Sequence, residues 1–480
     1  MRYNLRNRKY NRIILILFLI LFFITSLNIN PPEGLNTTAW RTLIVAFVMA
    51  VLWITEIIPL PATALLPLIL FPLLNIASIK SAAAPFAHPL IFLFLGGFII
   101  AQAMQKWNLH KRIALNIISV IGTKPNSIIA GFMVASAFLS MWISNTATAL
   151  MMMPIALSLV QLFKNDKVEI KDRSNFSLVL LLSIAYSCSI GGVGTLIGTP
   201  PNALMAAYLQ DNHAITIGLV EWMLIGIPFV LISLPIAFVI LTKIIFPVEL
   251  KLNESSKFIN NEKEKLGKIS SEEKNVAIVF AIVALLWVSR PLLTGFVSNL
   301  TDTGIAIAGA VILFFIPSKN SDKRIMNWRD TEKIAWGILI LFGGGLSLAS
   351  GIQNSGLAEW IGKLFSGLNN APTILIVLLI TATIIFLTEL TSNLATTAAF
   401  LPIAAAIAVQ FNVDVLTFVV PAAIAASCAF MLPVATPPNA IIFSSGEISI
   451  KQMARAGLIL NLVFIVIVVL ISMFWGRAVL

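Results

Sequence analysis

Two short polar phrases each occur twice in this chain, and every copy lies within a long apolar stretch. The first phrase is Ser144-Asn145-Thr146, which returns as Ser392-Asn393-Leu394. The second is Thr199-Pro200-Pro201-Asn202, which returns as Thr436-Pro437-Pro438-Asn439. Paired prolines and small polar residues interrupt helices, and at membrane depth such backbone is tolerated only where it is buried in protein or lines a cavity. The repeated phrases therefore predict broken helices around an internal cavity.

The composition places most of the chain in a lipid bilayer. Hydrophobic residues make up 58% of the sequence and charged residues only 11%, whereas ordinary soluble chains carry about 25% charge. A large soluble helical protein is thereby excluded. The net charge of +11 does not indicate nucleic acid as a partner, because the basic residues lie in loops between apolar spans, where cytoplasmic loops of membrane proteins carry them.

The apolar stretches predict an all-α integral membrane protein with eleven transmembrane helices. Most of these stretches reach the ~18 residues that are needed to cross a bilayer. The expected spans are residues 13–29, 39–58, 61–79, 88–105, 175–209, 221–247, 275–293, 302–317, 334–352, 415–445 and 455–476.

Two further apolar segments, residues 126–163 and 370–410, carry the Ser-Asn phrases at their middles. Each is too long for one span and breaks halfway, which predicts two re-entrant hairpins. With the N-terminus in the cytoplasm, this topology leaves only five of the 32 Lys and Arg residues outside and puts the C-terminus outside. We therefore expect a multi-pass protein of the cytoplasmic (inner) membrane, with the first hairpin opening from the cytoplasm and the second from outside.

The spacing of the motifs indicates an inverted-topology repeat. The Leu93–Gly97 segment (LFLGG) matches Leu341–Gly345 (LFGGG), and each final glycine lies 47 residues before the serine of its Ser-Asn phrase. We expect four segments: residues 1–38 as the cytoplasmic N-terminus and first span, 39–247 as the first repeat, 248–274 as a cytoplasmic linker and 275–480 as the second repeat. Broken helices at corresponding places of two such repeats indicate the binding site of a secondary transporter.

The hairpins and broken spans contain no side chain that could balance a bound anion, because residues 126–163, 174–242 and 364–450 contain no Lys or Arg. Helix N-termini at the breaks supply part of the positive potential. Asn and Ser oxygens and freed backbone carbonyls are hard ligands suited to Na⁺, which would supply the rest. The residues therefore favour a transporter that couples an anion to cations. Glu389, inside the second hairpin, is either a structural partner or a residue that tunes a cation site.

At these residues the chain resembles the divalent anion/sodium symporter family, which carries di- and tricarboxylates and, in some members, sulfate. The resemblance extends from WITEIIPLPATALLPL at 53–68 to LPVATPPNAIIFSSG at 432–446. It implies a homodimer that works as an elevator, in which a fixed scaffold domain holds a mobile transport domain with the hairpins.

The resemblance also implies the binding residues. One Na⁺ would be held by Ser140, Ser144, Asn145 and Gly198, and a second by Thr388, Thr391, Asn393 and Ala435. The substrate carboxylates would meet Asn145, Thr146, Thr199, Pro200, Asn393, Thr436 and Pro437, while Pro201, Asn202, Pro438 and Asn439 would support the helix breaks. The departure is Leu394, where the motif has threonine.

The resulting hypothesis is a Na⁺-coupled symporter that imports C4-dicarboxylates such as succinate, malate or fumarate. Its co-transported ion is Na⁺ and its other partners are the dicarboxylate and the bilayer. A dicarboxylate exchanger, or a sulfate or citrate transporter of the same family, remains the alternative. An anion channel would need a continuous pore. An enzyme is not expected, since the spans hold no metal cluster, acid pair or nucleophile–base set.

Overall fold

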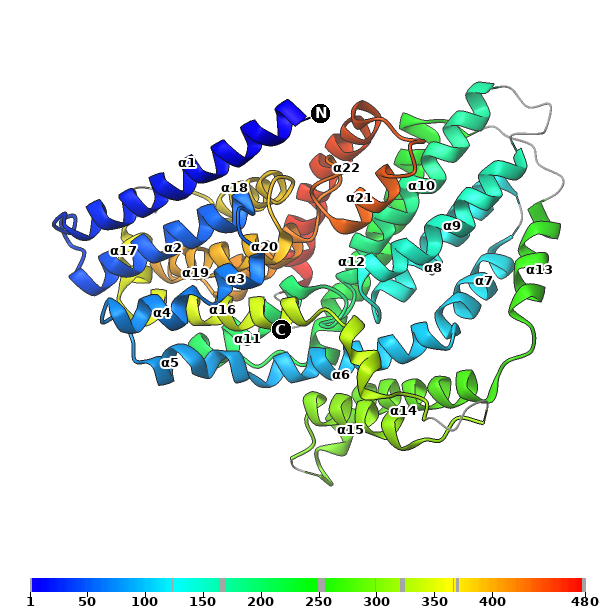
Figure 1. The fold of residues 1–480 in the computed structure, drawn as a ribbon, viewed down its shortest axis with the longest axis horizontal. Coiled ribbons are helices and arrows are strands. Elements are labelled where there is room, and N and C mark those ends of the chain that lie inside the picture. The colour runs from blue at the N-terminus through cyan, green and yellow to red at the C-terminus, as the bar shows by residue number, and fades with distance from the viewer. Residues whose placement is uncertain are drawn as a thin grey trace.

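The computed structural model describes residues 2–122, 124–163, 170–248, 255–297, 299–319, 324–365, 367 and 371–476 (Figure 1). Within these ranges the chain is helical, apart from turns, irregular segments and one isolated β-bridge between Pro317 and Arg324. This confirms the predicted all-α class.

The first half of the chain forms twelve α-helices in the described residues. They are α1 (Arg2–Leu27), α2 (Thr37–Thr55), α3 (Leu60–Ala64), α4 (Leu66–Leu73), α5 (Ile79–Ala83), α6 (Pro89–Lys106), α7 (Leu109–Ile121), α8 (Pro125–Ser140), α9 (Asn145–Phe163), α10 (Ile170–Gly192), α11 (Pro200–His213) and α12 (Leu219–Val239).

The second half contributes ten further α-helices to the described part of the chain. They are α13 (Ser255–Leu266), α14 (Ser271–Leu293), α15 (Asp302–Phe315), α16 (Trp336–Asn354), α17 (Leu357–Leu364), α18 (Thr373–Thr388), α19 (Asn393–Gln410), α20 (Leu416–Ala426), α21 (Pro437–Phe443) and α22 (Ile450–Leu470).

Eight helical stretches of the described residues are long and apolar enough to cross a membrane. They are Thr37–Thr55, Ile79–Lys106, Ser174–Gly192, Leu219–Ile245, Ser271–Leu293, Trp336–Asn354, Asn393–Gln410 and Ile450–Gly476. Other expected spans are shorter or broken: the one at 61–79 is the pair α3 and α4, with Pro61 and Pro67 in their first turns. The expected number of eleven crossings therefore stays a prediction.

The order of elements from α6 to α12 is repeated from α16 to α22. In each series two helices joined by a four-residue tip, α8–α9 and α18–α19, are followed by a helix that breaks at a Thr-Pro-Pro phrase. The breaks lie between α10 and α11 and between α20 and α21, where the motifs predicted them. The inverted orientation and re-entrant path of the hairpins stay predictions.

Three shorter helices were not expected. Helix α7 and its counterpart α17 follow α6 and α16, and α13 lies within the expected linker. Helix α7 presents one apolar face, with Leu109, Ala114, Leu115 and Ile118 buried. Such helices are too short and too amphipathic to appear as span-length apolar stretches in the sequence.

The long buried helix α10 carries the first break and packs along both arms of the first hairpin, α8 and α9 (Figure 1). Gly191 allows this approach, because a Cβ there would lie 2.2 Å from the carbonyl oxygen of Ala137 on α8. The tip of the hairpin is thereby held against the segment in which α10 unwinds.

Candidate substrate and cation site

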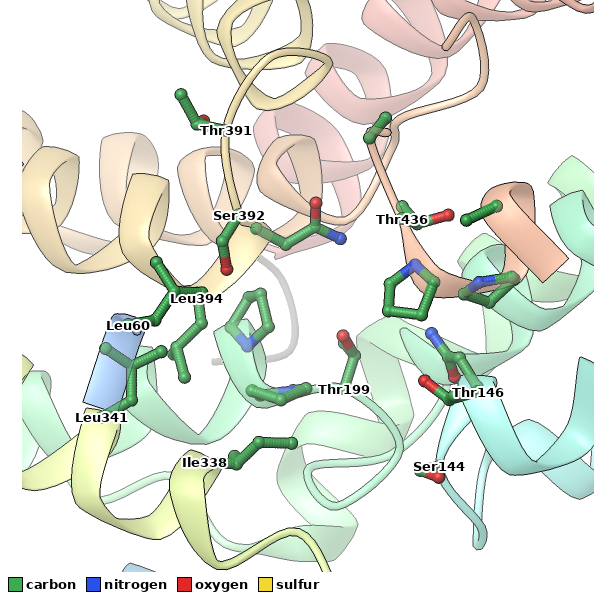
Figure 2. A pocket seen from close by; sticks show the side chains of 18 of the residues that line it. Leu60, Ser144, Thr146, Thr199, Ile338, Leu341, Thr391, Ser392, Leu394 and Thr436 are labelled. Carbon is green, nitrogen blue, oxygen red and sulfur yellow. The ribbon is translucent and has the colours of Figure 1, made fainter. Parts of the chain in front are cut away.

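The two hairpin tips and the two helix breaks meet at one cavity of about 640 Å³ (Figure 2). Four short segments, far apart in the sequence, form most of its polar wall. They are Ser144–Thr146, Gly198–Pro201, Thr391–Leu394 and Ala435–Pro438. The volume lies within the range of about 300–1,000 Å³ that is typical of small-molecule sites.

At the first tip, oxygen atoms from the hairpin and the break converge. The Ser140 hydroxyl donates to Asn145 Oδ1 at 2.8 Å. The same amide packs against Gly192 at the start of the break. A Cβ added to Gly192 would lie 2.8 Å from Asn145 Oδ1 and 3.2 Å from the Gly198 carbonyl oxygen, so both oxygens are next to this glycine. Three oxygens expected to bind one cation are therefore close neighbours.

The second tip reproduces this arrangement. The Thr388 hydroxyl lies 2.9 Å from Asn393 Oδ1, five residues later as in the first hairpin, and 3.0 Å from the carbonyl oxygen of Ala426 at the end of α20. The Thr391 hydroxyl is engaged with Leu387 O and with the Thr396 hydroxyl. Hydroxyl and amide oxygens thus pair in the same way in both halves.

Asn202 and Asn439 fix the two unwound segments by the same hydrogen bonds. Each side-chain amide donates to carbonyl oxygens ten and seven residues earlier in the chain. For Asn202 these are Gly192 (3.3 Å) and Thr195 (2.8 Å), and for Asn439 they are Ala429 (3.2 Å) and Leu432 (3.1 Å). Buried carbonyls that have lost their helical partners are thereby satisfied.

The cavity contains almost no formal charge. Among the residues that the structure describes, its lining includes no Lys or Arg, and its one acidic residue is Glu56 just after the end of α2. Helices α9, α11 and α19 begin at its wall, with Asn145, Pro200 and Asn393 as their first residues. The N–H groups of a helix N-terminus favour an anion, but each terminus is equivalent to at most about half a charge. A dianion held here still needs cations beside it.

One side of the cavity is apolar. Leu394 lies next to Leu60 of α3 and Leu341 of α16 in Figure 2, and Phe94 and Phe98 of α6 extend the same lining. Leu394 is 4% exposed. The leucine that departs from the motif thus forms part of a hydrophobic wall beside the polar segments.

Glu389 is a buried hydrogen-bond acceptor at the second tip. Its carboxylate accepts N–H groups of Phe430 (2.6 Å), Met431 (2.9 Å) and Leu432 (3.0 Å), and the Asn461 side-chain amide at 2.8 Å. Three of these donors belong to the unwound segment after α20. Glu389 therefore fastens the second hairpin to the break, which matches the structural alternative of the sequence analysis.

The structure brings the predicted site residues together around this cavity. All seven expected to meet the carboxylates line the cavity, as do six of the eight assigned to Na⁺. Ser140 and Thr388 lie behind the wall and contact it through Asn145 and Asn393. Pro201 and Pro438 also line the cavity, whereas Asn202 and Asn439 are buried behind it.

Thr195, which no sequence motif singled out, fastens the first hairpin to its break. Its hydroxyl donates to the Met141 carbonyl oxygen at 2.5 Å and accepts the N–H of Gly198 at 3.0 Å. Met141 stands in the first half where Glu389 stands in the second. In the sequence, Thr195 could have been recognised only as the one polar residue of the glycine-rich segment before Thr199.

Comparisons with known proteins identify the family of this chain. The family model of the sodium:sulfate symporter transmembrane region matches residues 9–480. The sodium-dependent dicarboxylate transporter SdcS of Staphylococcus saprophyticus is 43% identical over 479 residues, covering 98% of this chain and 92% of the relative. The SdcS of Staphylococcus aureus strain USA300 is also 43% identical, over 95% of this chain and 89% of the relative.

A solved structure shares the fold. The YdaH transporter of Alcanivorax borkumensis superposes with a TM-score of 0.61 and covers 91% of this chain and 98% of its own, at 12% sequence identity. At this identity the match concerns the fold alone.

Proposed function

This chain belongs to the family of sodium:sulfate symporters, and we propose that it is a Na⁺-coupled symporter that imports C4-dicarboxylates such as succinate, malate and fumarate. The observation that carries the proposal is a single cavity with both Ser-Asn tips and both Thr-Pro-Pro breaks, whose described lining residues include no basic side chain. The names of its relatives, sodium-dependent dicarboxylate transporters, support the same substrate class.

In this mechanism Na⁺ creates the anion site. Each Na⁺ is a cargo ion held by hydroxyl, amide and carbonyl oxygens of one tip and its break. The first set is Ser140, Ser144, Asn145 and Gly198; the second is Thr388, Thr391, Asn393 and Ala435. The two charges lie on either side of the cavity and offset the cost of bringing two carboxylates out of water.

The carboxylates then bind between the two tips, against Asn145, Thr146, Thr199, Pro200, Asn393, Thr436 and Pro437. Their hydrogen bonds come from side-chain amides, hydroxyls and helix N-termini. The hydrogen bonds of Thr195 and Glu389 tie each tip to its break, and those of Asn202 and Asn439 hold the unwound segments themselves. We infer that each tip and its break move as one body, as an elevator mechanism requires, within a homodimer whose N-terminus lies in the cytoplasm.

Uptake of labelled succinate into proteoliposomes tests the proposal. An inward Na⁺ gradient should drive accumulation, and choline in its place should not. Uptake should also be electrogenic if more positive charge enters with Na⁺ than negative charge with succinate. Equal uptake in choline that depends on preloaded dicarboxylate would show an exchanger instead.

Leu394 should set a preference for substrates with an apolar middle. The wall of Leu394, Leu60 and Leu341 offers contact to the methylene or vinyl carbons of succinate or fumarate and no hydrogen bond to sulfate, whose unpaired oxygens would cost ~1–3 kcal/mol each. Native protein should therefore discriminate against sulfate. In Leu394→Thr, competition against labelled succinate should shift toward malate by no more than ~1–2 kcal/mol.

Isoleucine at the same position is the matched control, because it keeps an apolar side chain of the same size. Equal competition by sulfate and succinate in the native protein, or unchanged ratios in Leu394→Thr, would show that this wall does not contact the substrate.

A further inference from the structure

A second cavity, of about 820 Å³, lies beside the first hairpin. Of the described residues that line it, four lysines and one glutamate are charged: Lys106, Lys111, Lys265, Lys333 and Glu262. Burial lowers the pKa of His110, which also lines it, to about 4, so that this ring is neutral near pH 7. The lysines therefore give the cavity a net positive charge.

Two of these lysines are already paired. Lys106 bonds with Asp330 at 2.8 Å, and Lys265 pairs with Glu262. Lys111 is half-buried and Lys333 is exposed, and neither has an ion pair or hydrogen bond within the part of the chain that the structure describes. Lys111 is therefore available to a ligand, and Lys333 can meet one beside Asp330, whose carboxylate it also attracts.

The second cavity continues the walls of the first. On α6, Phe94 and Phe98 line the main cavity, and at the next two turns of the same face Gln102 and Lys106 line the second. On α9, the main cavity includes Thr146 and the second begins at the following residue. It continues along one face with Leu150, Met151, Pro154, Ile155 and Ser158. The same two helices thus lead from the neutral site to the basic cavity.

The remaining wall comes from segments that the sequence analysis left without a role. Helix α7 contributes Lys111, and α13, inside the expected linker, contributes Lys265. Figure 1 shows α13 beside α7 at the edge of the molecule, and the two helices pack together. In the expected topology these segments are cytoplasmic.

We propose that this basic cavity is a cytoplasmic vestibule, a second and weaker binding site for the transported dicarboxylate. A dianion leaving the main site passes a place where lysine charge offsets its own, and one arriving from the cytoplasm is concentrated there. The proposal rests on the proposed function and orientation, and it assigns to Lys111 and Lys333 an effect on the cytoplasmic side only. The chemistry of the vestibule, basic groups beside apolar side chains, also fits the headgroup of an anionic lipid.

The test compares both faces in membrane vesicles. The double variant Lys111→Gln/Lys333→Gln is measured by initial uptake of labelled succinate into inside-out vesicles, which present the cytoplasmic face, and into right-side-out vesicles. The external Na⁺ concentration is the same for both kinds of vesicle. The ionic strength is kept low by using sucrose in place of salt to maintain the osmolarity. The half-saturating succinate concentration should rise roughly threefold per lysine at the cytoplasmic face and stay unchanged at the outer face. Added choline chloride should remove the difference.

The matched control is Lys80→Gln/Lys363→Gln, which removes two exposed charges expected at the outer face. An unchanged cytoplasmic value at low salt, or equal changes at both faces, would overturn the vestibule. Failure of the native protein to transport succinate with Na⁺ would instead reject the proposed function.

A lipid occupant is separated by reconstitution in phosphatidylcholine alone. A lysine effect that persists there supports the transported anion as the ligand. An effect that appears only after anionic phospholipid is added would assign the cavity to a headgroup and overturn the proposal.

Discussion

Alanine in place of Asn145 or of Asn393 is expected to abolish or greatly weaken Na⁺-driven succinate uptake while the protein still folds. Each asparagine presents an amide oxygen beside a hydroxyl, that of Ser140 at 2.8 Å or Thr388 at 2.9 Å. Removing one hydrogen bond or ligand to a charged group costs ~1.5–3 kcal/mol, which alone lowers affinity roughly 10- to 100-fold. Because the anion site depends on the bound cations, succinate and Na⁺ affinity should fall together.

The control is Asn354→Ala, at the exposed end of α16, where the amide donates a hydrogen bond to the Ser350 hydroxyl one turn earlier. Uptake and Na⁺ affinity are measured in proteoliposomes that contain equal amounts of each folded protein. If Asn145→Ala or Asn393→Ala kept native Na⁺ affinity and uptake, the cation site assigned to that half would be wrong.

Glu389→Gln is expected to cause the second large loss of transport. The cause is a displaced helix break and not a lost contact with the substrate. The native carboxylate accepts four N–H groups, three at Oε1 and one at Oε2, whereas a glutamine has one acceptor oxygen and turns an NH₂ group toward the donor or donors at the other position. Each buried N–H left unpaired costs ~1–3 kcal/mol. Both the free energy of unfolding and the rate of uptake should fall.

The Na⁺ concentration for half-maximal uptake separates a positioning role of Glu389 from general destabilisation. It should rise in the folded fraction of Glu389→Gln, because Ala435 and Thr436 follow the displaced segment. Glu359→Gln, an exposed residue of α17, is the matched control. A Glu389→Gln protein with native stability and Na⁺ dependence would show that the four hydrogen bonds do not hold the break.

The sequence predicted the site best where polar residues interrupt apolar ones. Ser144-Asn145 and Thr199-Pro200 stand out in apolar surroundings, and the equal spacing of Gly97 and Gly345 from the following Ser-Asn phrases identified the repeat. The structure confirms the breaks at these phrases because proline and polar side chains act locally on the helix.

What the sequence did not predict depends on the path of the chain between these points. The carbonyl partners of Asn202 lie in an unwound segment whose course no periodic pattern describes. Leu394 lines the cavity with Leu60 and Leu341, which come from distant elements. From the sequence, leucine at the threonine position of the motif therefore indicated only a missing hydroxyl and not an apolar wall. Helices α7 and α13 are short and amphipathic or charged, and their basic cavity forms only when they pack on α9 and each other.

The most direct test of the central claim is succinate binding to the purified protein as a function of Na⁺ concentration. We propose that cations supply the positive charge that the cavity lacks. Succinate should therefore bind too weakly to detect in choline chloride and progressively more tightly as Na⁺ replaces choline at constant ionic strength. By linkage, saturating succinate should tighten Na⁺ binding by the same factor. Equal succinate affinity in choline and in Na⁺ would contradict the account, because the anion would then be held without cations.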